Sequence, residues 1–240
     1  MKINKLFLMN NDCYKAGKKI AVKGIMVHST GANNPWLKRY LPDDGKIGKN
    51  KYGNHWNTAR PGGIQVCVHG FIGKLADGSV ATYQTLPWNH RGWHAGGSAN
   101  NTHIGFEICE DGLNDSAYFN AVYKEAVELC AFLCKEYGLT EKDVICHSEG
   151  YKKGIASNHG DVMHWFPKHG KNMDTFRADV KKLLNSDTVA ELTEVEDIVA
   201  ELVMRGIITS KDLWLEKLKT DSNSYWLARK TVKFLRERGV

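Results

Sequence analysis

The chain has 240 residues, and its 33 lysines and arginines against 27 aspartates and glutamates give a formal net charge of +6. Apolar residues make up 42% and charged residues 25%, which is ordinary for a globular protein and excludes collagen-like, coiled-coil and disordered chains. No apolar run reaches the roughly 18–20 residues of a membrane-spanning helix, so we expect no membrane insertion. The modest positive charge suits an anionic polymer or surface as well as nucleic acid, and alone it does not decide between them.

The beginning of the chain and its cysteines both indicate a cytoplasmic site of synthesis. The first apolar stretch, Leu6–Met9, is shorter than the roughly 7–15 residues of a signal-peptide core, so we expect no signal peptide. None of the six cysteines has C-x-x-C spacing, and Cys130 and Cys134 lie one helical turn apart in an apolar setting. We therefore expect core packing for that pair and no disulfide framework.

In the first part of the chain the pattern predicts strands separated by long loops. A strand at 20–28 leads into a first loop, and a second loop at 41–63 is rich in Gly, Asn and Lys and is expected to line a site. A hairpin is predicted with strands at 64–70 and 79–86, because Asp77-Gly78 is a strong turn signal.

The second part alternates further strands with helices. Strands are predicted at 104–109 and 143–146, an irregular segment runs to 170, and helical periodicity appears at 116–137 and 174–185. Three short amphipathic helices follow at 192–205, 210–219 and 223–237. The predicted fold class is α/β, with a mixed central β-sheet flanked by helices and followed by a small C-terminal helical bundle.

The distributions of charged residues and of histidines divide the chain into the same two parts as the predicted elements do. All ten histidines lie between His28 and His169, and residues 186–240 carry a net charge of −1. We therefore expect a catalytic domain at 1–185 and a small helical domain at 190–240. The aromatic residues of that second domain, Trp214, Tyr225 and Trp226, suit a carbohydrate platform, but core packing is the more common role in so small a bundle.

Two histidines occupy equivalent positions at the ends of buried strands. His28 follows Ile25-Met26-Val27 and His147 follows Val144-Ile145-Cys146, and each precedes a serine. A histidine fixed at a strand end is suited to bind a metal ion, although a single one is as often a hydrogen-bonded residue at the edge of the core.

A third cluster lies downstream and offers one carboxylate among several imidazoles. Asp161 and His164 both lie close to His159, and two histidines plus a third protein ligand with one open position is typical of catalytic zinc. The spacing alone does not choose between Asp161 and His164 as the third ligand. Glu107, on a strand face shared with Gly105, is a candidate general base, the alternative being an exposed strand glutamate.

These motifs together resemble the zinc-dependent N-acetylmuramoyl-L-alanine amidases of the amidase-2 family, which includes phage endolysins and peptidoglycan recognition proteins. The resemblance covers roughly residues 20–170 and rests on Ile25–Thr30, Gly92–Gly96, Asn101 with Gly105-Phe106-Glu107, Cys146-His147 and His159-x-Asp161. It implies Zn²⁺ held by His28, His147 and Asp161, with Glu107 as the catalytic carboxylate. His159 stands where relatives carry an oxyanion-stabilising lysine, so it is assigned a catalytic role as well. A tyrosine that some relatives place in the central strand is absent, because Cys67-Val68-His69 occupies that region.

The same resemblance implies the substrate and its binding residues. Trp93 and His94 are expected to contact sugar or peptide, or else to anchor a loop, and Asn54 and Trp56 are expected to line the cleft. The implied reaction is cleavage of the amide between N-acetylmuramic acid and L-alanine of peptidoglycan, as in a phage or prophage endolysin that reaches the bacterial cell wall through a holin-type partner. No nucleic-acid partner is expected, and the C-terminal helices are expected to bind the wall or to mediate oligomerisation.

Three alternatives remain open at this point. Instead of an amidase, the chain would be a peptidoglycan-binding module without hydrolysis, a regulator that binds another protein, or a metallopeptidase that cuts within the stem peptide. The complete set of three ligands and a base argues against the first, and the identity of the bond that is cut separates the last.

Overall fold

The structure, a computed structural model, describes residues 1–238, together with the side chains of all of these except 186–193 and 236–237. The chain forms two compact units, Met1–Lys181 and Lys182–Val240, and each is described by itself.

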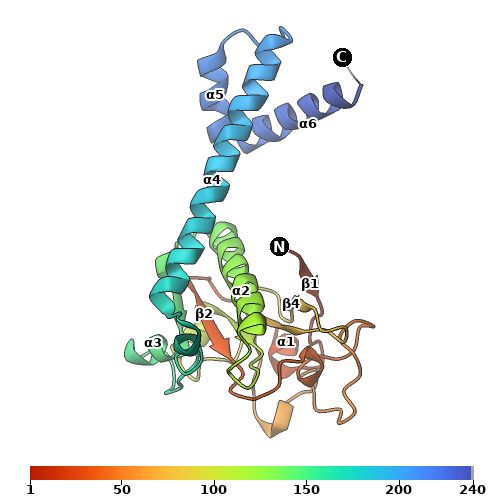
Figure 1. Cartoon of the computed structure of the whole chain (residues 1–240), viewed down its shortest axis with the longest axis vertical. Helices are drawn as coiled ribbons and strands as arrows, with labels where there is room; N and C mark the ends of the chain where they lie inside the picture. The colour runs from red at the N-terminus through yellow and green to blue at the C-terminus, as the bar shows by residue number, and fades with distance from the viewer. Residues whose placement is uncertain (239–240) are drawn as a thin grey trace. The chain divides into compact units, whose positions relative to one another are not determined.

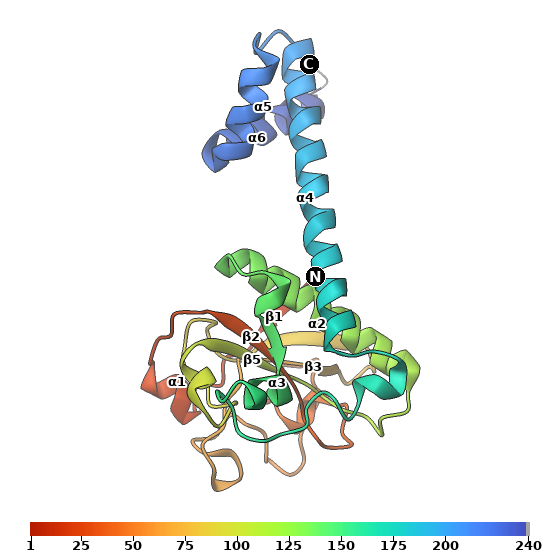
Figure 2. The same ribbon diagram turned by 90° about the vertical axis from the view of Figure 1, so that its left-hand side faces the viewer.

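Within the described residues, six strands and six α-helices are formed (Figures 1 and 2). The strands are β1 (Ile3–Lys5), β2 (Gly24–Ser29), β3 (Gly70–Lys74), β4 (Val80–Gln84), β5 (His103–Ile108) and β6 (Val144–Cys146). The helices are α1 (Asp12–Ala16), α2 (Ser116–Tyr137), α3 (His147–Lys152), α4 (Met173–Met204), α5 (Lys211–Thr220) and α6 (Ser222–Arg238).

The strands make one mixed sheet in the order β1-β4-β3-β5-β2-β6. Only β3 and β4 pair antiparallel, through the hairpin around Asp77-Gly78, and the other neighbours are parallel. The strand β2 is buried along its whole length, as expected for a strand between two others in a sheet covered on both faces. Helix α2 packs on β3 and β4, while α3 packs on β2 and β6. This arrangement confirms the predicted fold class.

Helix α2 is the clearest case of local sequence fixing an element. Asp115 accepts a hydrogen bond from the Tyr118 N–H at the first turn, and Gly138 ends the helix with a φ of 63°. That left-handed conformation favours glycine, and the aspartate satisfies a backbone donor that the helix leaves unpaired. The helix begins and ends where the sequence predicted.

Elsewhere the elements differ from the predicted bounds. The first hairpin strand, predicted at 64–70, is instead Gly70–Lys74. Residues 64–69 lie outside its regular ladder, and the Ile64 side chain is 65% exposed. The segment after His147 begins with the short helix α3, and the helix predicted at 174–185 continues in α4 to Met204. The elements β1 and α1 were not predicted, since three and five residues are too few for a periodic pattern.

The second unit has a small apolar core of its own, formed by residues of α4, α5 and α6. Trp214 and Tyr225 pack against this core, whereas the Trp226 side chain is 60% exposed. Among the described residues, no helix combines the length and apolar character that crossing a membrane requires.

Candidate metal centre and active site

Three neighbouring strands of the sheet deliver three of the predicted site residues side by side. In the pairing of β2 with β6, Val27 lies opposite Cys146, so His28 and His147 each come next along their chains. In the pairing of β2 with β5, His28 lies directly opposite Glu107. Because paired residues of adjacent parallel strands project from the same face, His28 and Glu107 lie together at one edge of the sheet, and His147, the first residue of α3, follows β6 at the same edge.

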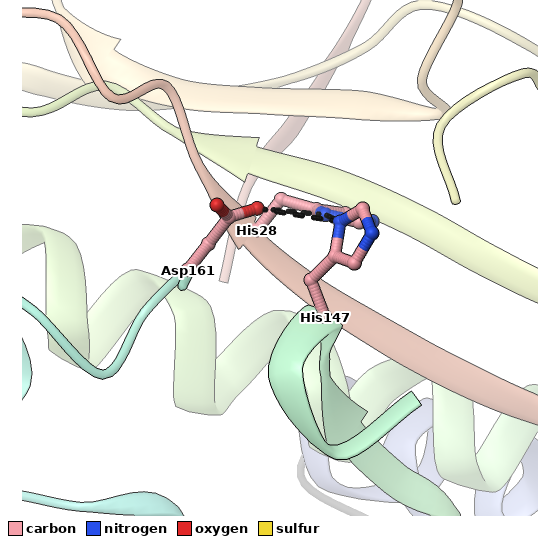
Figure 3. A group of neighbouring side chains, drawn as sticks. All are labelled: His28, His147 and Asp161. Carbon is pink, nitrogen blue, oxygen red and sulfur yellow. Dashed lines mark hydrogen bonds and ion pairs between the residues drawn. The ribbon is translucent and has the colours of Figure 1, made fainter. Parts of the chain in front are cut away.

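Asp161 joins the two histidines from the irregular segment that follows α3 (Figure 3). Its Oδ2 atom lies 3.2 Å from Nδ1 of His28 and 3.5 Å from Nδ1 of His147. The two Nδ1 atoms are 3.1 Å apart. Both histidines are almost fully buried, and Asp161 is half-buried. One atom from each of three residues therefore converges on one point.

The spacing and chemistry of these atoms fit a zinc ion. Ligands bound at about 2.0–2.1 Å in a tetrahedron lie about 3.3 Å from one another. The three observed separations, 3.1, 3.2 and 3.5 Å, bracket that value. Two imidazole nitrogens and one carboxylate oxygen also form the donor set of catalytic zinc sites that keep a fourth position open. The residues present can hold a metal ion.

Hydrogen bonding presents the correct nitrogen of His28 to this point. Nε2 of His94 lies 3.2 Å from the carbonyl oxygen of His103, so that nitrogen carries a proton and donates it. The neutral His94 ring then has a lone pair on Nδ1, which accepts the Nε2–H of His28 at 2.9 Å. This assignment leaves the lone pair of His28 Nδ1 free for an ion. Such outer hydrogen bonds orient metal ligands and fix their tautomers.

His147 is oriented in the same way by a serine. The Ser157 hydroxyl donates to the carbonyl oxygen of Ala95 at 3.3 Å and so can accept the Nε2–H of His147 at 3.2 Å. The lone pair of His147 Nδ1 is therefore also directed toward the carboxylate. The sequence reasoning did not identify Ser157, which has no signal of its own apart from its place at the start of the His159-Asp161 segment.

The protonation of the cluster suits metal binding at neutral pH. Burial lowers the pKa of His28, although the neighbouring Asp161 opposes this effect, and the ring stays neutral. Burial by itself would raise the pKa of Asp161, but the two neighbouring rings of His147 and His28 outweigh burial, and the net pKa is lowered. His28 thus offers a neutral imidazole and Asp161 an ionised carboxylate, the forms that bind a metal.

Glu107 lies beside the cluster with one oxygen unused. Its Oε2 is buried and has no hydrogen-bond partner among the described residues. Burial raises its pKa well above the usual value, and the charges of Asp161 and Glu110 add to this shift. A buried carboxylate with an unsatisfied oxygen and a raised pKa is typical of a group that exchanges protons.

A sequence model of the amidase-2 family, N-acetylmuramoyl-L-alanine amidase, matches residues 18–164, which is more than half of the chain. The chain belongs to this family. The matched region contains the two histidines, the aspartate and the glutamate of the cluster.

Comparison with individual proteins agrees with this family membership. The chain is 41% identical over 68 residues to N-acetylmuramoyl-L-alanine amidase XlyA of Bacillus subtilis (strain 168), a stretch that spans 27% of this chain and only 22% of XlyA. PlyL shares the fold with a TM-score of 0.52 at 20% identity, covering 75% of this chain and 98% of PlyL. The hydrolase AmiA of Staphylococcus aureus, solved with its ligand, shares the fold with a TM-score of 0.54 at 19% identity, covering 77% of this chain and 83% of AmiA.

The remaining residues that the resemblance assigned to this amidase site lie at different places. His159 is exposed, and its ring centroid is 4.7 Å from that of His147. Trp93 is 36% exposed, pairs with Cys67 through its backbone, and carries the Arg91 guanidinium 4.4 Å from its ring centroid. His94 is the hydrogen-bond partner of His28, as described above. Their roles toward a substrate stay predictions.

Asn54 and Trp56 follow each other closely in sequence but lie in different environments. Asn54 is exposed, and its carbonyl oxygen accepts a hydrogen bond from Arg39 at 2.9 Å. The Trp56 indole packs edge-on against Phe71, with ring centroids 5.0 Å apart, and against Tyr40. Most of that ring therefore contributes to the core, and the expected contact with substrate stays a prediction for both residues.

The structure also separates His164 from the cluster and gives it a different partner. Its Nε2 lies 2.8 Å from Oε1 of Glu110, a buried residue that also accepts the Gly31 N–H. Asp161, and not His164, joins the two histidines in the structure. Glu110 was not identified from sequence. It follows β5 three residues after Glu107, and an acid at the end of a buried strand is the only signal that points to it.

Proposed function

We propose that this chain is a peptidoglycan hydrolase that cleaves the amide between the lactyl group of N-acetylmuramic acid and L-alanine of the stem peptide. Membership of the amidase family supports the reaction class. The observation that carries the proposal is the convergence of His28, His147 and Asp161, with Glu107, whose Oε2 has no partner among the described residues, in register beside His28.

Zinc is the ion that this donor set fits best, and when bound it supplies polarisation of the scissile carbonyl and a lowered pKa for water. The side chains of the protein do the rest. His28, His147 and Asp161 hold the ion with their orientation fixed by His94 and Ser157. Glu107 accepts a proton from the attacking water and returns it to the departing amine, which its raised pKa favours.

His159 is assigned the stabilisation of charge on the substrate oxygen. Its exposed ring lies next to His147 and can reach a ligand at the centre without being buried itself. An imidazole supplies a positive charge only when it is protonated, and its ordinary pKa is about 6.5. A lysine at the same position would carry its charge at neutral pH without this condition.

The decisive experiment replaces the base and leaves the ligands unchanged. Glu107→Gln keeps the size of the side chain and removes its ability to accept a proton, so we expect zinc binding to persist and hydrolysis to fall by about 10²–10⁴-fold. Glu136→Gln, an exposed change on α2, is the matched control. Release of muropeptide amino groups is the assay, and mass spectrometry identifies the bond. Wild-type hydrolysis by Glu107→Gln would refute the assignment, and cleavage inside the stem peptide would identify a peptidase.

The setting of this activity is proposed on the same basis. An amidase that removes stem peptides acts on the bacterial cell wall, and we assign the chain to the phage or prophage endolysins that reach the wall with a holin-type partner. The second unit, whose Trp226 and Phe234 side chains are 60% and 52% exposed, is assigned to wall binding or to oligomerisation. Exposed aromatic rings suit both roles, because they present flat apolar surface to a sugar or to a second chain.

A further inference from the structure

The long loop at 41–63 and the segment before it enclose a cavity with an unusual lining. Its volume is about 350 Å³, within the usual range for ligand pockets. Eight described residues line it, and they are four cations, three amides and one phenol: Lys38, Arg39, Lys49, Lys51, Asn34, Asn50, Asn54 and Tyr52. None of these eight carries a carboxylate.

The four cations have no acidic partner within the described part of the chain. Arg39 uses one Nη1–H on the carbonyl oxygen of Asn54, at 2.9 Å. The ammonium groups of Lys38 and Lys51 lie 5.0 and 4.9 Å from the ring centroids of Trp36 and Tyr52, respectively. Backbone oxygen and aromatic faces therefore position three of the cations, and none of the four belongs to an ion pair between described residues.

The two acids of the same loop do not neutralise the cavity, because the loop itself uses them. Asp43 Oδ1 accepts the N–H groups of Gly45 and Gly48 at 2.9 and 3.0 Å. Asp44 accepts the Lys46 and Ile47 N–H groups with Oδ1 and the Tyr83 hydroxyl with Oδ2. The loop sequence mixes both charges, but in the fold its two carboxylates accept hydrogen bonds from the loop backbone and from Tyr83, while Lys49 and Lys51 line the cavity. Four like charges gathered in this way repel one another and attract anions.

The kind of anion follows from which cations are present. A carboxylate ligand is best held by a planar guanidinium in a bidentate pair, and this cavity has one arginine with part of its fork already used. The other three cations are lysines, which commonly bind phosphate groups as point charges. The exposed ring of Tyr52 and the amides of Asn50 and Asn54 add surface for a polyol or sugar. We propose that this cavity binds a phosphodiester-linked polyol or sugar polymer.

Such an occupant would also be linked to the catalytic region. The Asn34 N–H donates to the carbonyl oxygen of Glu110 at 2.8 Å, and Glu110 follows the strand that carries Glu107. The cavity wall is therefore attached to the end of β5. A polymer held there would keep the candidate centre close to that polymer, and this role requires no catalytic step.

The test measures binding of poly(glycerol phosphate) to the full chain at low salt. The double variant K49Q/K51Q removes two exposed cations of the cavity, and we expect about tenfold weaker binding and a smaller dependence of the dissociation constant on salt. The variant K18Q/K168Q removes two exposed lysines elsewhere and is the matched control, expected to bind as the wild type does. Circular dichroism checks that both variants are folded, and Tyr52→Ala tests the ring without changing charge.

Three results would overturn the proposal. The first is an equal loss of polymer binding in the two double variants. The second is tighter binding of polyglutamate than of poly(glycerol phosphate), and the third is no measurable binding of the phosphate polymer by the wild type. The experiment does not depend on hydrolysis, because Glu107→Gln should bind the polymer as tightly as the wild type. Failure of the proposed function would therefore appear in muropeptide release, and failure of this inference would appear only in polymer binding.

Discussion

The close packing of His94 against Gly105 allows a direct test of how the proposed metal ligand His28 is oriented. A Cβ atom added at Gly105 would lie 2.5 Å from Cγ and 2.6 Å from Cε1 of His94, far inside van der Waals contact. The ring must then move, and it would lose its 2.9 Å hydrogen bond to Nε2 of His28. Forcing extra volume into a packed site costs about 1–3 kcal/mol, and losing an outer hydrogen bond of a ligand typically weakens metal binding by about 10–100-fold.

We therefore expect Gly105→Ala to lower the free energy of unfolding by about 1–3 kcal/mol and the affinity for zinc by about 10–100-fold. Denaturant unfolding and competition with a chelator measure the two effects. Gly112→Ala is the control, because an added Cβ there makes only ordinary contact with Asn33, at 3.6 Å. In a His94→Ala background, space is available for the new methyl group, so Gly105→Ala should cost no more than about 0.5 kcal/mol. An undiminished cost in that background would refute the reasoning.

Three further predictions concern charge and the second unit. Burial lowers the pKa of His69 to about 4, while Nδ1 accepts the Gly105 N–H. The stability contributed by neutral His69 is therefore fully present above the unfolded pKa of about 6.5, and about 3 kcal/mol of it should be lost as the pH drops to 4. Denaturant midpoints should show this loss in the metal-free wild type and a shallower dependence in His69→Gln; equal slopes would contradict it. Asp161→Asn removes the anionic ligand, so zinc affinity should fall by more than about 100-fold in a chelator assay, and an unchanged affinity would exclude Asp161 as a ligand. Deleting the chain after Asn185 should preserve hydrolysis of soluble fragments and reduce binding to whole walls, and unchanged binding would remove the targeting role.

The sequence predicted an element well where a capping or turn residue stood next to a clear pattern of apolar residues. The capping residue Asp115, the periodic apolar face and Gly138 predicted α2 from end to end, and Asp77-Gly78 predicted the hairpin. The apolar runs before His28 and His147 indicated two histidines fixed at strand ends, and the downstream cluster and the family resemblance then favoured a metal site. Short elements such as β1 carry too little pattern for this, and their pairing with β4 is decided by tertiary contacts.

Spacing alone did not choose between Asp161 and His164, and it was the resemblance to the amidase family that favoured Asp161. Both lie in an irregular segment where spacing predicts no direction, and only the pairing of His164 with Glu110 shows which side chain turns away. Likewise, Gly105 read as empty space beside Glu107, and the structure fills that space with the ring of a distant residue, His94. Contacts between residues far apart in sequence leave no trace in local periodicity, so the sequence could propose the cluster but not the hydrogen bonds that orient it.

The three converging side chains, proposed as metal ligands, differ in how firmly the backbone holds them. His28 lies within a buried strand and His147 follows one directly, whereas Asp161 comes from an irregular stretch between α3 and α4. An ion bound by all three would therefore link this irregular stretch to the sheet. Chelation should loosen the fold locally as well as abolish chemistry, and a protease added to the stripped protein should cut first between residues 153 and 165.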